Sequence, residues 1–176
     1  WPCAYCSMFS LSSLAPALIA LGARIGIRGA DGEREIELAE LYRKPQAEGE
    51  SELSLAHQEL VTEILLPPAG PENATYEVRQ KEALDWPLAA AAVALEVADG
   101  VIRQARVVLG HVAPTPYVAD SASQALVGKA LSVEAAEEAG RLAVEGAKAL
   151  SGNGYKIQLA RVAAKRAVLR AGGMEV

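Results

Sequence analysis

Two Asp-Gly dipeptides place the strongest constraint on the fold of this chain, because each lies between two stretches with strand-like patterning. The first, Asp31-Gly32, separates residues 23–28 from residues 33–38, and apolar and polar side chains alternate in both stretches. Alternation with a period of two is typical of strands, and Asp-Gly is a favoured turn between antiparallel strands. The pattern predicts a β-hairpin here, followed by a polar, irregular surface loop over residues 39–56.

The second dipeptide, Asp99-Gly100, separates residues 89–97 from residues 101–109. Residues 101–109 read as a strand, whereas the small residues of 89–97 fit either a strand or a helix. The strong turn between the two stretches favours a second antiparallel hairpin.

Helices are predicted before and after these strands. Residues 12–22 begin with serines that can cap a helix, carry a proline in the first turn and end on a glycine. Three further helices are predicted at residues 121–126, 132–150 and 155–169, on the basis of apolar periodicity and terminal glycines. Because strands and helices are grouped along the chain rather than alternating, the predicted fold class is α+β.

A boundary between two units is predicted near residue 70. Residues 58–66 read as a strand that Pro67-Pro68 closes, and residues 69–73 read as a linker. A further strand is predicted at residues 76–81. We therefore expect one unit over residues 1–70 and a second over residues 71–176.

The composition predicts a packed core built from small side chains. The chain is 51% hydrophobic and 22% charged, which is the balance of a soluble globular protein. It holds 35 alanines but only eight aromatic residues, so close-packed helices and sheet faces are expected to provide most of the burial.

Charge and hydropathy narrow the classes of function. A net charge of −5 argues against general nucleic-acid binding, which depends on neutralising phosphates with Lys and Arg. The longest apolar run, residues 88–95, is far shorter than the roughly 20 residues of a membrane-spanning helix, and no signal segment opens the chain. A cytoplasmic protein is expected.

Because the chain begins with Trp1, we also expect it to be processed or to be part of a larger protein.

Residues that could form a self-contained catalytic site are few. The two histidines, His57 and His111, lie on either side of the predicted linker, and no serine or cysteine near them has the pattern of a nucleophile elbow. We expect structural roles for both. No glycine-rich phosphate-binding motif is present. Cys3 and Cys6 have the spacing of a thiolate pair, but structural zinc and most iron-sulfur sites need about four ligands.

Several stretches along the chain match one protein family in order and spacing. They are residues 13–23, 59–64, 66–67, 76–85, 99–100, 109–116, 125–129 and 155–169. In these stretches the chain resembles the FAD-binding (medium) subunits of the molybdenum hydroxylases, such as xanthine dehydrogenase and carbon monoxide dehydrogenase. The resemblance implies a partial second FAD subdomain over residues 1–70. It also implies a C-terminal domain of antiparallel sheet plus three helices over residues 71–176.

The resemblance also implies which residues contact the cofactor. Leu60 and Val61 match an apolar pair that packs against the isoalloxazine ring in such subunits. Ser13 occupies the place of an Asp near the cofactor, and Glu77 occupies the place of a Lys near the ring. A cation near the flavin stabilises its reduced, anionic form, and a glutamate has the opposite effect. No catalytic residue and no metal ligand is implied, and the segments that hold the FAD pyrophosphate are expected in the missing front part of the subunit.

The flavin subunit of 4-hydroxybenzoyl-CoA reductase is similar in a further respect, since it carries an inserted iron-sulfur loop ahead of the corresponding first helix. Cys3 and Cys6 would then be a remnant of such an insertion.

Two functions follow from the resemblance. In the first, the chain is part of an FAD-binding electron-transfer subunit of a molybdopterin-dependent oxidoreductase. It would relay electrons between iron-sulfur centres and an external acceptor, with an iron-sulfur subunit and a molybdopterin subunit as partners. In the alternative, the chain is an assembly module without flavin, and the basic side chains of residues 155–169 form its docking face. Those side chains could instead complement the acidic residues of the preceding helix.

Overall fold

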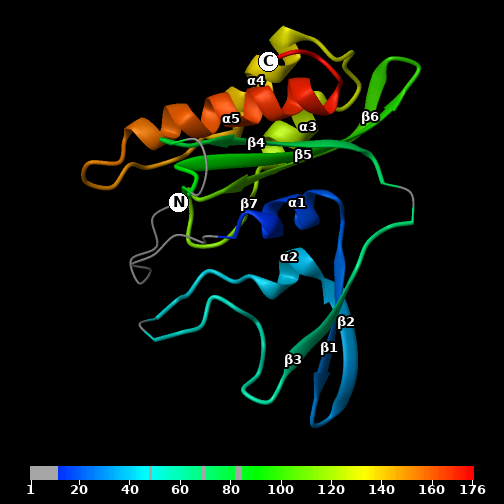
Figure 1. Ribbon diagram of the computed structural model, residues 1–176, viewed down its shortest axis with the longest axis vertical. Coiled ribbons are helices and arrows are strands. Elements are labelled where there is room, and N and C mark those ends of the chain that lie inside the picture. Colours follow the sequence, from blue (N-terminus) through cyan, green and yellow to red (C-terminus); the bar gives the residue numbers. More distant parts are fainter. Residues whose placement is uncertain (1–11, 48, 69, 82–84) are drawn as a thin grey trace.

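The computed structural model describes residues 12–47, 49–68, 70–81 and 85–176. Within these residues the chain forms a three-stranded and a four-stranded sheet, with strand orders β2-β1-β3 and β4-β5-β6-β7. Every pair of neighbouring strands is antiparallel. Figure 1 shows the two sheets as the lower and upper parts of the molecule, with helices between and above them. The predicted α+β fold class is confirmed.

The first sheet follows a short helix. Its elements are α1 (Leu14–Ala20), β1 (Arg24–Gly29), β2 (Gly32–Glu37), α2 (Leu38–Leu41) and β3 (Leu60–Leu65). The predicted hairpin is present, with Ile25 paired to Ile36 and Gly29 paired to Gly32. Its turn lies one residue earlier than predicted, at Ala30-Asp31, because Gly32 is already the first residue of β2. Ile25 and Ile27 of β1 are buried, because they share one face of the alternating strand.

The prediction of an irregular loop over residues 39–56 was wrong at its start, where α2 forms. The Glu37 backbone amide donates to the Glu40 side chain (3.2 Å), as part of a reciprocal capping box. Leu38 and Leu41, three positions apart, are both buried in the core beneath the first sheet. The cap and this burial together stabilise the helix. The polar composition of the segment gave no indication of a helix here.

The second sheet contains the predicted second hairpin. Its strands are β4 (Glu72–Val78), β5 (Ala89–Ala98), β6 (Val101–Gly110) and β7 (Tyr117–Val118). Asp99 (φ 55°) and Gly100 (φ 73°) both adopt the left-handed conformation that a type I′ hairpin turn requires. Residues 89–97 are therefore a strand, which settles the ambiguity left by their small side chains.

Strand β4 corrects two predicted boundaries. It begins at Glu72, inside the predicted linker of residues 69–73, and it ends at Val78 rather than at residue 81. Its limits are set by pairing with β5, from Glu72 opposite Leu95 to Val78 opposite Ala89. Such long-range pairing overrides the local turn signals.

Three helices cover one face of the second sheet, as Figure 1 shows: α3 (Asp120–Leu126), α4 (Val133–Ala143) and α5 (Tyr155–Ala171). Helix α4 is shorter than the predicted range of 132–150. Gly146 lies beyond its end with φ 74°, a left-handed conformation that cannot continue a helix. Helix α4 begins with Ser132, whose hydroxyl accepts a hydrogen bond from the Ala135 amide (3.1 Å).

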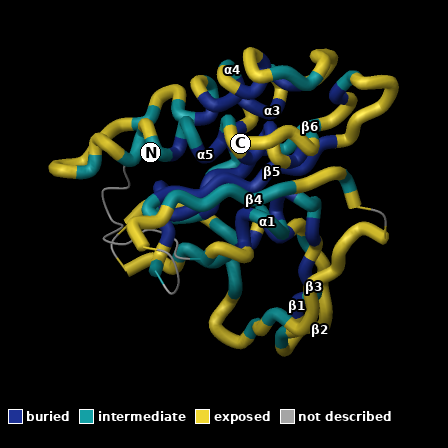
Figure 2. The backbone as a smooth tube through the Cα atoms, turned by 45° about the horizontal axis from the view of Figure 1, so that its top comes forward, coloured by how far each residue is buried: buried dark blue, intermediate teal, exposed yellow. Residues whose placement is uncertain are grey.

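The alanine content is explained by β5, which lies between two cores. Ala91, Val93 and Leu95 belong to the core beneath α3, α4 and α5, whereas Ala92 and Ala94 belong to the core shared with α1 and the first sheet. Figure 2 shows β5 as the buried centre of the fold. Small side chains let helices approach both faces of this strand closely.

No helix among the described residues is long and apolar enough to cross a membrane.

Candidate functional site

The four residues predicted to contact a cofactor lie in two places in the structure. Leu60 and Val61 belong to β3, in the first sheet. Ser13 precedes α1, and Glu77 lies on β4 in the second sheet. Ser13 and Glu77 both lie near His111, a residue for which only a structural role was expected from the sequence.

Leu60 and Val61 lie on an edge strand and differ in their environment. β3 pairs with β1 on one side only, so its other backbone edge is open among the described residues. The residue facing Val61 across the ladder is the buried Ile27, and Val61 packs against the core, half-buried. Leu60 is 59% exposed. Because successive strand residues point to opposite faces, Leu60 rather than Val61 offers a free apolar surface.

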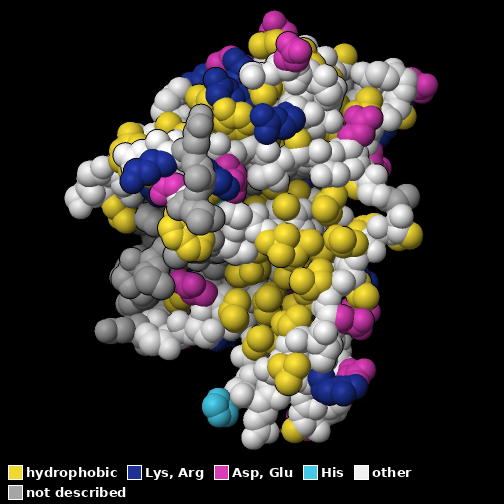
Figure 3. Space-filling model, viewed as in Figure 1, with side chains coloured by type: hydrophobic (Ala, Val, Ile, Leu, Met, Phe, Trp, Pro, Cys, Tyr) yellow, Lys and Arg dark blue, Asp and Glu magenta, His cyan; other side chains and the backbone are white. Residues whose placement is uncertain are grey.

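Leu60 is one of several exposed apolar side chains on α1 and around β3. They are Leu14, Leu60, Ile64, Leu65 and Leu66, each at least 37% exposed. Figure 3 shows hydrophobic side chains gathered over the part of the molecule that holds α1, α2 and the first sheet. An exposed apolar surface of this kind marks a site for a ligand or for another segment of protein.

The second place is the polar surrounding of His111, directly after β6. His111 is 2% exposed and has φ 62°, which is uncommon for a residue with a side chain. Its Nε2 lies 3.1 Å from Ser13 Oγ, and its backbone oxygen accepts a hydrogen bond from Lys156 Nζ (3.1 Å). Glu77 and Gly110 both face Ala90 in the sheet, which places the Glu77 side chain on the same side of the sheet as α1.

The burial of His111 disfavours a positive imidazole. Burial is the main cause that lowers the pKa of His111, and the Lys156 and Arg79 cations lower it further, whereas Glu77 acts in the opposite direction. The Glu77 carboxylate is itself paired with Arg79. Burial also lowers the pKa of Lys156.

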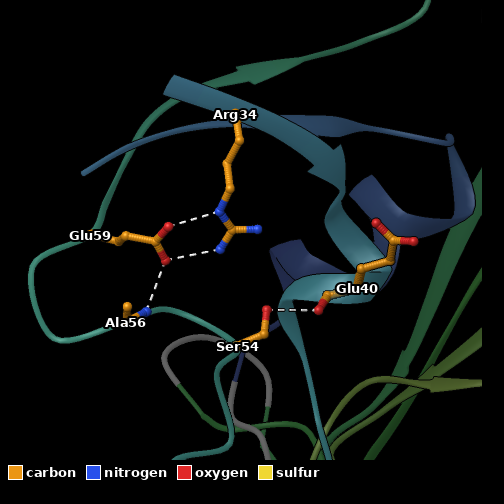
Figure 4. A network of polar contacts seen from close by, with 5 residues as sticks. All are labelled: Arg34, Glu40, Ser54, Ala56 and Glu59. Carbon is orange, nitrogen blue, oxygen red and sulfur yellow. Dashed lines mark hydrogen bonds and ion pairs between the residues drawn. The ribbon is translucent and has the colours of Figure 1, made fainter. Parts of the chain in front are cut away.

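A hollow of about 430 Å³ lies between the tip of the first hairpin and the loop before β3. Its lining includes Asp31, Glu33, Arg34, His57 and Glu59. Arg34 donates to both oxygens of Glu59 (2.8 and 2.9 Å), and the Ala56 amide donates to one of them (2.8 Å), as Figure 4 shows. These donors, Arg34 foremost, lower the pKa of Glu59 to about 2.

The hollow does not suit an anionic ligand such as a diphosphate. Three of its side chains are carboxylates, and the Arg34 guanidinium that faces them is already bound by Glu59. Beyond the hollow, the same loop is fastened to α2 by a hydrogen bond from the Ser54 hydroxyl to the Glu40 backbone oxygen (2.8 Å), also drawn in Figure 4.

No group of three or more His, Cys, Asp or Glu side chains in the described part of the chain could hold a metal ion. Cys3 and Cys6 lie outside the described residues. His57 is exposed in the loop before β3, whereas His111 is buried directly after β6. Reasoning from sequence missed the contact between Ser13 and His111, because 98 positions separate them and neither belongs to a recognised motif.

Two family models match the chain. The model of the FAD binding domain in molybdopterin dehydrogenase matches residues 6–69, and that of the CO dehydrogenase flavoprotein C-terminal domain matches residues 74–171. The chain is 35% identical over 162 residues to the carbon monoxide dehydrogenase medium chain of Afipia carboxidovorans, covering 89% of this chain and 54% of that one. It is 31% identical over 134 residues to the nicotine 6-hydroxylase medium subunit of Paenarthrobacter nicotinovorans, covering 76% and 44%.

The fold is similar to that of a solved Cu,Mo-CO dehydrogenase in its cyanide-inactivated form. The TM-score is 0.77 at 31% identity, over 92% of this chain and 56% of the other. The chain thus spans about half the length of the relatives it matches. The family matches, the identities and the shared fold agree, and the chain belongs to the FAD-binding medium subunits of the molybdenum hydroxylases.

Proposed function

We propose that this chain is part of an FAD-binding subunit of a molybdenum-containing oxidoreductase, in which the flavin ring lies against the exposed edge of β3. The observation that carries the proposal is the exposed Leu60 on an open edge strand, within the segment matched by the FAD-binding domain. An apolar side chain on an open edge is the kind of surface on which a planar ring packs. FAD supplies electron transfer when bound, and the protein supplies its position and surroundings.

The described residues suit a flavin ring better than they suit its diphosphate. The β3 edge provides Leu60, and Val61 beneath it anchors the strand in the core. The polar hollow between the first hairpin and the loop before β3 carries three carboxylates and an Arg34 already bound by Glu59. A second hollow, beside Thr62 and Glu63 of β3, likewise has three glutamates in its lining. We infer that the diphosphate is held by chain outside the described residues, since the relatives are about twice as long.

Ser13 and Glu77 are proposed to lie near the flavin from the side of His111, away from the β3 edge. Ser13 is a neutral hydroxyl that contacts the His111 ring, and Glu77 is an anion paired with Arg79, so neither residue supplies a positive charge to a ligand. A carboxylate near the ring would oppose the build-up of negative charge on reduced flavin. The expected consequence is a lower reduction potential than a lysine at position 77 would give.

Electron relay between iron-sulfur centres and an external acceptor is part of the same proposal, with an iron-sulfur subunit and a molybdopterin subunit as partners. Support comes from the relatives, which are described as medium subunits of a carbon monoxide dehydrogenase and a nicotine 6-hydroxylase. The division into domains at residues 1–70 and 71–176 and the cytoplasmic location stay predictions.

The test is a flavin absorbance and fluorescence titration of two samples, the 176-residue chain and the longest polypeptide that its gene encodes. Binding by the longer form alone would support a cofactor site that is shared with chain outside the described residues. Leu60→Ser is expected to weaken binding, and Leu150→Ser, at a side chain of similar exposure on the other unit, serves as the control. Failure of both forms to bind FAD would refute the proposal.

The alternative of an assembly module without flavin is favoured by one observation, the pair of exposed arginines at the end of α5. Arg166 and Arg170 both lie over the Tyr76 ring, with distances of 5.1 and 5.0 Å from guanidinium carbon to ring centroid. Both arginines also donate hydrogen bonds to β4, but no carboxylate among the described residues pairs with them. Arg161 and Lys165 of the same helix are instead paired with Glu137 of α4 (3.0 and 2.6 Å), as helix–helix complementarity predicts. Retained assembly with partner subunits in a chain that never binds FAD would favour this function.

A further inference from the structure

Two arginines near the C-terminal end of α5 lie over one tyrosine of β4, the strand that α5 packs against (Figure 1). The guanidinium carbons of Arg166 and Arg170 are 5.1 and 5.0 Å from the centroid of the Tyr76 ring. Both arginines are exposed, and Tyr76 is half-buried against the core beneath the helices. Because the two arginines are four positions apart, they lie on the same side of the helix. We call these three side chains the arginine cluster.

The positive charge of the arginine cluster is not balanced by the described part of the chain. No carboxylate there pairs with Arg166 or Arg170, whereas their neighbours Arg161 and Lys165 are both paired with Glu137. Two like charges four positions apart on a helix repel each other. An anion that bridges the two guanidinium groups would remove this repulsion, so the cluster favours a negatively charged ligand.

The hydrogen-bonding groups of the cluster are donors with capacity to spare. Arg170 donates one bond to the Thr75 backbone oxygen (3.3 Å), and Arg166 donates one to the Tyr76 hydroxyl. A guanidinium has five N–H groups, so each arginine keeps several for another acceptor. The Tyr76 oxygen accepts the bond from Arg166, and its own O–H has no acceptor among the described residues. A fitting ligand must therefore accept several hydrogen bonds, as a carboxylate does.

The charge of the whole chain favours a protein carboxylate over a nucleic acid or an anionic membrane. Surfaces rich in phosphate bind proteins that neutralise many phosphates together, and this chain has a net charge of −5. One or two carboxylates need only the two guanidinium groups that the cluster provides, because an arginine can bind a carboxylate through two parallel hydrogen bonds. Arginine and tyrosine are also among the residues that contribute most to binding at protein interfaces.

We propose that the arginine cluster docks an acidic segment of a partner subunit, whose carboxylates are bound by Arg166, Arg170 and the Tyr76 hydroxyl. The proposal rests on the proposed function in one respect, namely that the chain assembles with other subunits. It does not depend on flavin. Tyr76 packs on the side of the second sheet that the helices cover, whereas the next residue, Glu77, points to the opposite face, and the surface proposed for the flavin ring belongs to β3.

Binding of a short acidic peptide tests the cluster without requiring the identity of the partner. The peptide alternates glutamate with glycine and carries a fluorescent label, and its control has glutamine in place of glutamate. Fluorescence anisotropy with the longest polypeptide that the gene encodes should show binding of the acidic peptide only. Arg166→Gln/Arg170→Gln should weaken that binding by about tenfold or more, since hydrogen bonds between charged groups are lost.

The matched control is Arg103→Gln/Arg141→Gln, which removes the same charge at two exposed arginines that are paired with Asp99 and Glu138. It should leave the affinity for the peptide nearly unchanged. Inorganic phosphate at the concentration of the peptide should not displace it. Displacement would show a site for a free oxyanion and would overturn the docking surface.

The assembled complex tests whether the acidic segment belongs to a partner subunit. After co-expression with the other subunits, Arg166→Gln/Arg170→Gln should lose its partners at a lower salt concentration than the unaltered subunit, as followed by size-exclusion chromatography. Flavin absorbance of the same fractions reports FAD binding separately, so missing flavin in an intact complex would count against the flavin site alone. Unchanged peptide affinity or unchanged assembly in Arg166→Gln/Arg170→Gln would overturn the docking proposal.

Discussion

At the scale of single residues, the strongest electrostatic feature is the pairing of Glu59 with Arg34. The loop before β3 has few backbone hydrogen bonds of its own, and this carboxylate ties it both to β2 and to the Ala56 amide. The donors favour the ionised carboxylate, which is why the pKa of Glu59 lies at about 2.

Replacing Arg34 by glutamine should return the pKa of Glu59 toward its ordinary value, as followed by carboxyl NMR. The pKa of Glu59 is lowered in the folded state, so its contribution to stability is complete above about pH 4.5. That contribution is lost as pH falls through about 2. The difference in unfolding midpoint between the two proteins should therefore narrow as the pH is lowered from 5.

Arg24→Gln is the matched control, because Arg24 is an exposed arginine on the same hairpin that pairs with Glu35 instead. It should leave the Glu59 titration unchanged. If the pKa of Glu59 is the same with and without Arg34, the ion pair is not populated in solution.

Glu77 carries a second prediction at this scale. If Glu77 lies near the flavin, Glu77→Lys should raise the flavin reduction potential, because a cation stabilises the reduced, anionic form. The measurement is a potentiometric titration of the flavin-loaded protein. Glu72→Lys, the same charge change at the other end of β4, is the control, and equal shifts in both variants would contradict the placement of Glu77.

At the scale of elements, close approach between helices decides how α4 and α5 pack over the second sheet. Ala136, Ala139 and Ala143 of α4 are buried in the core beneath the helices, and Gly140 faces α5. A Cβ at Gly140 would lie 2.6 Å from the Arg161 carbonyl oxygen. The backbone of one helix is in contact with the backbone of the next, so the crossing depends on the absence of a side chain.

Gly140→Ala should therefore destabilise the protein by about 1–3 kcal/mol, measured by urea denaturation, because the two helices must separate. Helix propensity alone acts in the opposite direction, favouring alanine by up to about 1 kcal/mol. Gly70→Ala, at a glycine with open space around it, should cause no loss of stability. A more stable Gly140→Ala protein would show that α4 and α5 are not in backbone contact.

At the scale of the whole molecule, the two sheets differ in how their edges are protected. At the β4 edge, Arg170 donates to the Thr75 backbone oxygen (3.3 Å), and Arg166 bonds the Tyr76 hydroxyl. The β3 edge instead carries exposed leucines. Glu63 is the one charged side chain on β3, and the other exposed side chains of the strand are mostly apolar. Largely apolar open edges tend to pair with other chains.

The double variant Leu60→Ser/Leu66→Ser should reduce both dye binding and self-association of the chain, because it removes one exposed apolar side chain from β3 and one just beyond its end. Fluorescence of an anilinonaphthalene dye and sedimentation velocity measure the two effects. The control is Val127→Ser/Leu150→Ser, at side chains of similar exposure in the second unit. Equal effects from both double variants would mean that the β3 edge has no special role.

The sequence determined the features that depend on neighbouring residues. The first hairpin follows from its alternating strands, the second follows from its Asp-Gly turn, and the last helix follows from a periodic pattern that ends at glycines. Short-range hydrogen bonding and side-chain periodicity specify such elements locally, so they can be read without the fold. The FAD-binding family was likewise identifiable, because its motifs occur in order along the chain.

Only the tertiary structure decided the features that depend on distant residues. The capped, buried helix α2, the start of β4 and the two faces of the alanine strand β5 all depend on burial or pairing with remote segments. The same holds for the candidate site. The structure separates Leu60 from Val61 by exposure and brings Ser13 to His111 across 98 positions. A side chain's partner across the fold is set by packing of whole elements, which no local pattern encodes.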